Sequence, residues 1–279
     1  MRLRLSSLAL WACALIILSS FAVSAAATAP SANPASAVSS SAVSSVPLVS
    51  PHLWAGSSSS LNWAGYAVTA SAGAVSDVRG SWVVPAIQGT CPSTNQYSSF
   101  WVGIDGFNSN TVEQTGTDSD CRSGAPAYYA WYEFYPHPSK LISGVSVHPG
   151  DVVSAEVLYS GGRFTVSIQD LTTGASFSAS AKVRGAQRSS AEWIAEAPSS
   201  SGGILPLADF GTVSFGADTT GVASTCTATI GGVTGAIGSF GSSVQSISMV
   251  TSSAALKAQP SALSTDGTSF SVTWMSAGP

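Results

Sequence analysis

From Leu61 onward, the sequence is a series of short segments in which apolar and polar residues alternate. A period of two places successive side chains on opposite faces of a β-strand, and no segment has the 3.6-residue period of an amphipathic helix. Gly, Pro, Asn and Asp separate the segments, and Gly161-Gly162 predicts a hairpin turn. The predicted strands are Ser76–Val84, Ser99–Ile104, Thr111–Gly116, Ala127–Tyr135, Val152–Tyr159, Arg163–Asp170, Ala191–Glu196, Gly211–Phe215, Val244–Val250 and Thr268–Trp274. We therefore predict an all-β domain, a two-sheet antiparallel β-sandwich of the concanavalin A or lectin-like kind.

Charged residues are scarce. They make up 9% of the chain and the formal net charge is −4, whereas an ordinary globular domain is roughly 25% charged. Without a basic patch, the chain is not expected to bind nucleic acid. Because bases are few, the domain gains little self-repulsion when acid neutralises its carboxylates. The composition therefore fits either an acid-tolerant extracellular protein or an ordinary secreted β-domain with a hydroxyl-rich surface.

The three histidines, His52, His137 and His148, are too few and too scattered for a multi-histidine metal site. The metalloprotease motif HExxH is absent as well. We therefore expect no metal site.

The first 25 residues have the pattern of a secretory signal peptide. Arg2 and Arg4 precede an apolar run from Leu8 to Val23, and Val23-Ser24-Ala25 is similar to a cleavage site. Residues 26–60 are mostly Ala, Ser, Pro and Val, which predicts a disordered propeptide or linker that is removed in acid. No later stretch is apolar enough to span a membrane. We expect a secreted, extracellular monomer, with its folded domain in residues 61–279 and no membrane contact after signal removal.

Three cysteines follow the signal segment: Cys91, Cys121 and Cys226. A secreted protein of this kind is expected to form one disulfide bond. We favour Cys91–Cys121, since both are expected in loops that flank the same pair of strands. Cys226 would then be buried or free, although the sequence alone leaves the other pairings open.

Strand alternation also collects reactive side chains on one face. If the apolar faces meet between the sheets, the opposite faces would line one concave surface. The residues expected there are Trp101, Asp105, Gln114, Asp118, Trp131, Glu133, Tyr135 and Glu196. Aromatic rings and carboxylates suit an extended polymer, either peptide or glycan, and carboxylates can act as general acids and bases. The nucleophile motif GxSxG and the DTG or DSG of aspartic peptidases are absent, and Asp218-Thr219-Thr220-Gly221 has the wrong spacing.

Six motifs occur in a characteristic order. They are Asn62-Trp63-Ala64-Gly65, Trp82-Val83-Val84-Pro85, Phe100-Trp101-Val102-Gly103-Ile104-Asp105-Gly106, Glu113-Gln114-Thr115-Gly116-Thr117-Asp118, Ala130-Trp131-Tyr132-Glu133-Phe134-Tyr135-Pro136 and Ala191-Glu192-Trp193-Ile194-Ala195-Glu196. In this ordered set, the chain resembles the glutamic peptidases, also called eqolisins. The resemblance covers most of residues 61–250.

The resemblance implies an endopeptidase that works in acid without metal or cofactor and acts on proteins or peptides. It implies a catalytic pair of Gln114 and Glu196 on the concave face of a β-sandwich. The residues that it implies for substrate binding are Trp101, Asp105, Asp118, Trp131, Glu133 and Tyr135. The chain departs from the fungal members at Ala197-Pro198 and in its cysteine pattern, so substrate preference and disulfides are not carried over.

The expected chemistry is consistent with those two side chains. A glutamate has an ordinary pKa of about 4.3, so Glu196 is partly ionised in mild acid and can take a proton from water. The amide of Gln114 can donate to the developing oxyanion. The alternatives are a glycan-binding or glycan-cleaving sandwich, in which a second carboxylate would accompany Glu196, and an adhesion module without catalytic activity.

Overall fold

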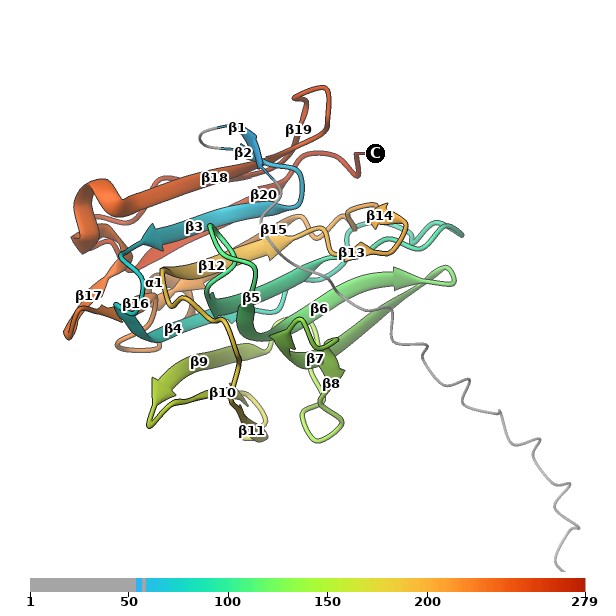
Figure 1. Cartoon of the computed structure of the whole chain (residues 1–279). Coiled ribbons are helices and arrows are strands. Elements are labelled where there is room, and N and C mark those ends of the chain that lie inside the picture. The colour runs from blue at the N-terminus through green and yellow to red at the C-terminus, as the bar shows by residue number, and fades with distance from the viewer. Residues whose placement is uncertain (1–53, 57–58, 279) are drawn as a thin grey trace, which may run out of the picture. The chain divides into compact units, whose positions relative to one another are not determined.

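The computed structural model describes residues 54–56 and 59–278, which belong to a compact unit spanning Ser44–Pro279. The expected signal peptide, residues 1–25, and most of the expected propeptide lie outside the described residues. The unit is a sandwich of two β-sheets (Figure 1), and this confirms the predicted all-β fold. Its helical segments in the described part are the four-residue α1 (Ala217–Thr220) and a 3₁₀ helix, η1 (Ile237–Ser243).

Sheet 1 carries the candidate site and is antiparallel throughout. Its strands can be followed in Figure 1 from β18 near the top to β7 and β8 lower down. Their order is β18 (Val244–Val250), β3 (Trp63–Thr69), β12 (Ser190–Glu196), β5 (Ser99–Ile104), β6 (Val112–Arg122), β7 (Ala125–Tyr135) and β8 (Lys140–Leu141).

Sheet 2 forms the second layer. It begins with β11 (Ser176–Ala181), β10 (Arg163–Asp170), β9 (Val152–Ser160) and β4 (Val75–Val83). The far side of β4 is shared by β16 (Thr227–Ile230), which continues into β17 (Val233–Ala236), and by β15 (Thr212–Gly216). From β15 the sheet continues through β20 (Ser269–Trp274) and β19 (Leu256–Pro260) to β18. A separate pair, β13 (Ser199–Ser200) and β14 (Gly203–Ile204), follows β12.

Strand β18 belongs to both layers. Residues Val244–Ile247 pair with β3 of sheet 1, whereas Met249 and Val250 pair with β19 of sheet 2. The short β2 (Ser59–Ser60) runs parallel to β18 and also pairs with β1 (Trp54–Gly56). The layers are therefore joined along one edge, and β2 pairs with β18 at this joint.

The main hydrophobic core fills the space between the layers. Sheet 1 contributes Phe100, Val102 and Trp193, and sheet 2 contributes Trp82 and Phe215 among others. A second, smaller cluster lies on the opposite face of sheet 1, which we call the site face. That cluster contains Trp63, Ala67, Trp101, Phe107, Trp131, Ile194 and Ile247. The central strands β12 and β5 of sheet 1 are thus buried on both faces, one of which carries the candidate site.

The predicted strands match the structure closely where alternation is strong. Ser99–Ile104, Arg163–Asp170 and Val244–Val250 coincide with β5, β10 and β18. The Gly161-Gly162 turn is confirmed, because both glycines have positive φ, 59° and 76°, as a tight hairpin between β9 and β10 requires. Strand β6 runs well past the predicted end at Gly116. The sequence pattern also missed β3, β11, β19 and the β16–β17 hairpin.

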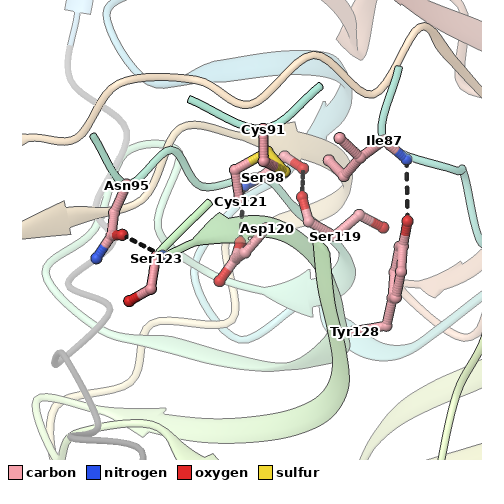
Figure 2. Close-up of a disulfide and its surroundings, with 9 residues drawn as sticks. All are labelled: Ile87, Cys91, Asn95, Ser98, Ser119, Asp120, Cys121, Ser123 and Tyr128. Carbon is pink, nitrogen blue, oxygen red and sulfur yellow. Dashed lines mark hydrogen bonds between the residues drawn. A yellow bond between two sulfur atoms is a disulfide. The ribbon is translucent and has the colours of Figure 1, made fainter. Parts of the chain in front are cut away.

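The disulfide bond between Cys91 and Cys121 is confirmed (Figure 2). Cys226 is buried and free. The expected location of Cys121 in a loop was wrong: it lies in β6, because that strand continues to Arg122. The bridge ties the β4–β5 connection to the end of β6. A hydrogen bond holds the same two segments together nearby, because the backbone N–H of Ser98 donates to Asp120 Oδ1 at 3.1 Å.

Candidate functional site

Strand register determines which side chains share the site face. Across sheet 1, one row of paired residues is Trp63, Glu196, Ser99, Asp118 and Tyr129. The next row is Gly65, Ile194, Trp101, Gly116 and Trp131, and a third is Ala67, Glu192, Gly103, Gln114 and Glu133. Tyr135 follows Glu133 on the same side of β7. The register therefore brings seven of the eight predicted site residues onto one face.

Glu196 and Gln114 lie on either side of β5, opposite Ser99 and Gly103 of that strand. The Glu196 carboxylate is buried, and among the described residues the side chains of Trp101 and Asn62 donate hydrogen bonds to it. Trp101 Nε1 donates to Oε2 at 2.8 Å, and Asn62 Nδ2 approaches Oε1 at 3.4 Å. Donors of this kind favour the ionised form of a carboxyl group.

Gln114 is held by Glu133. Its Nε2 donates to Glu133 Oε2 at 2.7 Å, and both side chains are almost fully buried. The pKa of Glu133 is raised well above its ordinary value, mainly by burial. The hydrogen bond from Gln114 acts to lower this pKa, and the charge of Glu196 acts to raise it. Glu133 is therefore neutral in acid, where it serves as a hydrogen-bond acceptor that orients the amide of Gln114.

Asp118 is the centre of a second buried group on the site face. Its carboxyl accepts hydrogen bonds from Trp131 Nε1 at 2.6 Å and from the Tyr129 hydroxyl at 2.7 Å. Burial, with the nearby charge of Asp120, raises the pKa of Asp118 well above its ordinary value. Arg122 pairs with Asp120 at 2.9 Å and closes the group at the end of β6. Trp101 and Trp131 thus each donate an indole N–H to an acidic side chain.

Two glycines leave room for the Trp101 side chain between these acids. A Cβ atom at Gly116 would overlap the carbonyl oxygen of Phe100, and one at Gly103 would lie 2.9 Å from Trp101 Cζ3. Trp63 packs edge-on against Trp101, with ring centroids 4.9 Å apart. The buried Trp101 side chain therefore packs between the row that holds Glu196 and the row that holds Gln114.

Asp105 lies in a different environment from the rest of the predicted set. It follows the last residue of β5 with φ of 70°, and it is fully buried. Its carboxylate accepts hydrogen bonds from the backbone N–H groups of Gln187, Arg188 and Ser189 at 2.7, 2.6 and 2.9 Å. Asp105 therefore anchors the loop that leads into β12.

Two contacts at the site were not predicted from the sequence. Asn62 appeared only as part of a motif, although its side chain contacts Glu196, and Tyr129 was not singled out although it bonds Asp118. Alternation aligns Tyr129 with Trp131 on the same face of the strand, although Tyr129 is not among the predicted site residues. Asn62 precedes β3, where alternation gives no signal.

In residues 54–56 and 59–278, no group of three or more His, Cys, Asp and Glu side chains is arranged to hold a metal ion. Within the same part of the chain, every helix is too short or too polar to cross a membrane.

Fold and site together define a β-sandwich with a buried carboxylate and a side-chain amide on one sheet face. Residues 61–259 match the model of the Peptidase A4 family, and the chain belongs to that family. It is similar to Aspergillopepsin-2 from Aspergillus niger, with 33% identity over 178 residues, 56% of this chain and 62% of the relative. It is also similar to Scytalidopepsin B from Scytalidium lignicola, with 38% identity over 76 residues, 26% of this chain and 28% of the relative. The matches thus cover less than two thirds of either relative.

Solved structures agree with this membership. Scytalido-glutamic peptidase, solved with a transition state analog inhibitor, has a TM-score of 0.63 and 26% identity, covering 77% of this chain and 98% of that one. Aspergilloglutamic peptidase from Aspergillus niger has a TM-score of 0.55 and 29% identity, covering 64% and 99% of the two chains.

Proposed function

We propose that the protein is a secreted acid endopeptidase in which Glu196 and Gln114 form the catalytic pair. The observation that carries the proposal is that a carboxyl group and a side-chain amide lie on the same site face, each held by hydrogen bonds to other side chains. Glu196 has hydrogen-bond donors on both oxygens, from Trp101 and Asn62, and Gln114 is oriented by Glu133. Membership of a peptidase family supports a peptide substrate.

The proposed reaction needs one base and one oxyanion donor. The Glu196 carboxylate takes a proton from water as the water oxygen attacks the scissile carbonyl carbon. Gln114 uses one amide N–H on Glu133 and offers the other to the developing oxyanion. Glu196 then returns its proton to the leaving amine, so that the carboxylate is regenerated. Neither group changes its net proton content over the cycle.

The remaining site residues are proposed to bind the substrate. An extended peptide would run across the site face near Trp101 and Trp131, beside Asp118, Glu133 and Tyr135. Scytalido-glutamic peptidase was also solved with a peptide based transition state analog, which supports peptide binding in this fold. Asp105 keeps a positioning role through the loop before β12.

Family membership does not favour the glycan alternative, and the described side chains that donate to Glu196 are an indole and an amide. Secretion through the expected signal peptide, and a monomeric state, remain part of the proposal. Both can be checked on the protein from culture supernatant by N-terminal sequencing and by light scattering.

The decisive experiment compares variants on a protein substrate in acid. We expect Glu196→Gln and Gln114→Ala each to abolish casein cleavage at pH about 3–4, near the ordinary pKa of glutamate, while the β-sheet circular dichroism is unchanged. Glu156→Gln and Gln169→Ala, on sheet 2, are matched controls and should stay active. Full activity in either site variant, or release of sugar from a polysaccharide without proteolysis, would reject the proposal.

A further inference from the structure

Asn62 reaches Glu196 from a part of the chain 134 residues away. Its Nδ2 lies 3.4 Å from Glu196 Oε1, on the oxygen that Trp101 does not bind. This distance is long for a hydrogen bond, but such contacts commonly shorten when substrate binds. We propose that Asn62 and Ser60 form a positioning pair that holds the Glu196 carboxylate for proton transfer, a role that rests on the proposed activity of Glu196.

The hydroxyl of Ser60 fixes which end of the Asn62 amide faces Glu196. Ser60 Oγ accepts the backbone N–H groups of Asn62 at 3.3 Å and of Trp63 at 3.1 Å. A hydroxyl with both acceptor positions used has its single proton left to donate. Ser60 Oγ donates it to Asn62 Oδ1 at 2.9 Å. Because Oδ1 is occupied in this way, Nδ2 is the atom turned toward the carboxylate.

The backbone around this pair is held on both sides. The carbonyl of Asn62 accepts the N–H of Ala197 at 2.8 Å, directly after Glu196, and Trp63 is the register partner of Glu196. Ser60 pairs with Met249 of β18. Ser60 and Asn62 are both fully buried. The amide is therefore fixed relative to Glu196 by sheet pairing as well as by side-chain contacts.

The test is the pH dependence of kcat/KM for peptide cleavage. Activity rises with pH along the acid limb as the base ionises, and a donated hydrogen bond favours that ionised form. We expect Asn62→Ala to lower kcat/KM roughly tenfold at low pH and to move the acid limb up by about one pH unit, with KM changed less than about twofold. Asn62→Asp places a carboxyl beside Glu196 and should move the limb further.

Substitutions at Ser60 separate orientation from packing. Ser60→Ala should move the acid limb in the same direction as Asn62→Ala, whereas Ser60→Thr keeps the hydroxyl and should restore the wild-type profile. Asn95→Ala, at an asparagine that is hydrogen-bonded to Tyr97 and Ser123 and not to Glu196, is the matched control.

Melting temperatures measured beside the kinetics separate a structural defect from a positioning defect. Variants that have a lower melting temperature but keep the wild-type acid limb would overturn the proposal. A pH profile of kcat/KM for Asn62→Asp that superimposes on that of the wild type would also overturn it. Absence of proteolysis in the wild-type protein would instead reject the proposed function.

A consequence concerns the start of the mature protein. The expected propeptide ends at residue 60, but the positioning pair requires Ser60, so any processing must cut before it. N-terminal sequencing of active protein after acid incubation should find a start at or before Ser60. Fully active protein that starts at Leu61 or later, with an unmoved acid limb, would overturn the role of Ser60.

Discussion

At the scale of single residues, the site depends on acidic groups with different environments. Glu196 receives donors from Trp101 and Asn62. Glu133 is buried, and its raised pKa keeps it neutral in acid. Two carboxyls on one face can thus have different protonation states at the same pH, which is a common arrangement where one acts as base and another as hydrogen-bonding partner.

Substitution of Glu133 tests this division of roles. Glu133→Gln keeps a neutral side chain with an acceptor oxygen for Gln114, so we expect kcat/KM at pH about 4 to stay within about threefold of wild type. Glu133→Ala removes the partner 2.7 Å from Gln114 Nε2 and should cost roughly tenfold or more. Equal losses in the two variants would show that a carboxyl group itself is needed.

At the scale of elements, the end of β5 determines the position of the loop before β12. Asp105 has positive φ, which Asp and Asn tolerate better than most residues with a Cβ atom. Its two carboxylate oxygens bond successive N–H groups of that loop, and Ser189 Oγ adds a contact at 3.2 Å. The loop leads directly into β12 and hence to Glu196.

We therefore expect substitutions at Asp105 to change stability more than substrate binding. Asp105→Ala should lower the unfolding free energy by roughly 3 kcal/mol, because several hydrogen bonds to a charged group are lost, and Asp105→Asn should cost less. Urea unfolding at pH about 4, beside KM for a peptide, measures both quantities. A variant with normal stability and a strongly raised KM would place Asp105 among the substrate-binding residues instead.

Strand alternation predicted much of the site face but not its edges. Trp101, Gln114, Glu133 and Glu196 share that face because each lies within a regular strand. Asp105 was grouped with Trp101, yet β5 ends at Ile104, and alternation has no meaning beyond a strand end. The contact of Asn62 with Glu196 depends on β3 pairing with β12. Pairing between distant strands leaves no local pattern to read.

At the scale of the whole molecule, the sandwich buries several acids that lack a nearby base. Burial, reinforced by Asp105, raises the pKa of Glu113 to about 9. Burial also raises the pKa of Glu192 well above its ordinary value. The two side chains lie on opposite faces of sheet 1, and at both of them neighbouring acids add to the effect of burial on the pKa. Neutral carboxyl groups are therefore part of the folded state.

This arrangement predicts a protein that is most stable in acid. A carboxyl with a raised pKa binds its proton more tightly when folded, so its stabilising effect is complete below the unfolded value, 4.5 for glutamate, and is lost as pH rises to about 9 for Glu113. We expect the melting temperature to fall over this window, each group contributing roughly 1.4 kcal/mol per pH unit. Glu113→Gln and Glu192→Gln should each flatten the decline, whereas Asp218→Asn, at an exposed carboxylate, should not. A melting temperature that rises between pH 5 and 8 would contradict the prediction. So would an unchanged pH dependence of the melting temperature in both Gln variants, because the protonation of Glu113 and Glu192 would then not be its cause.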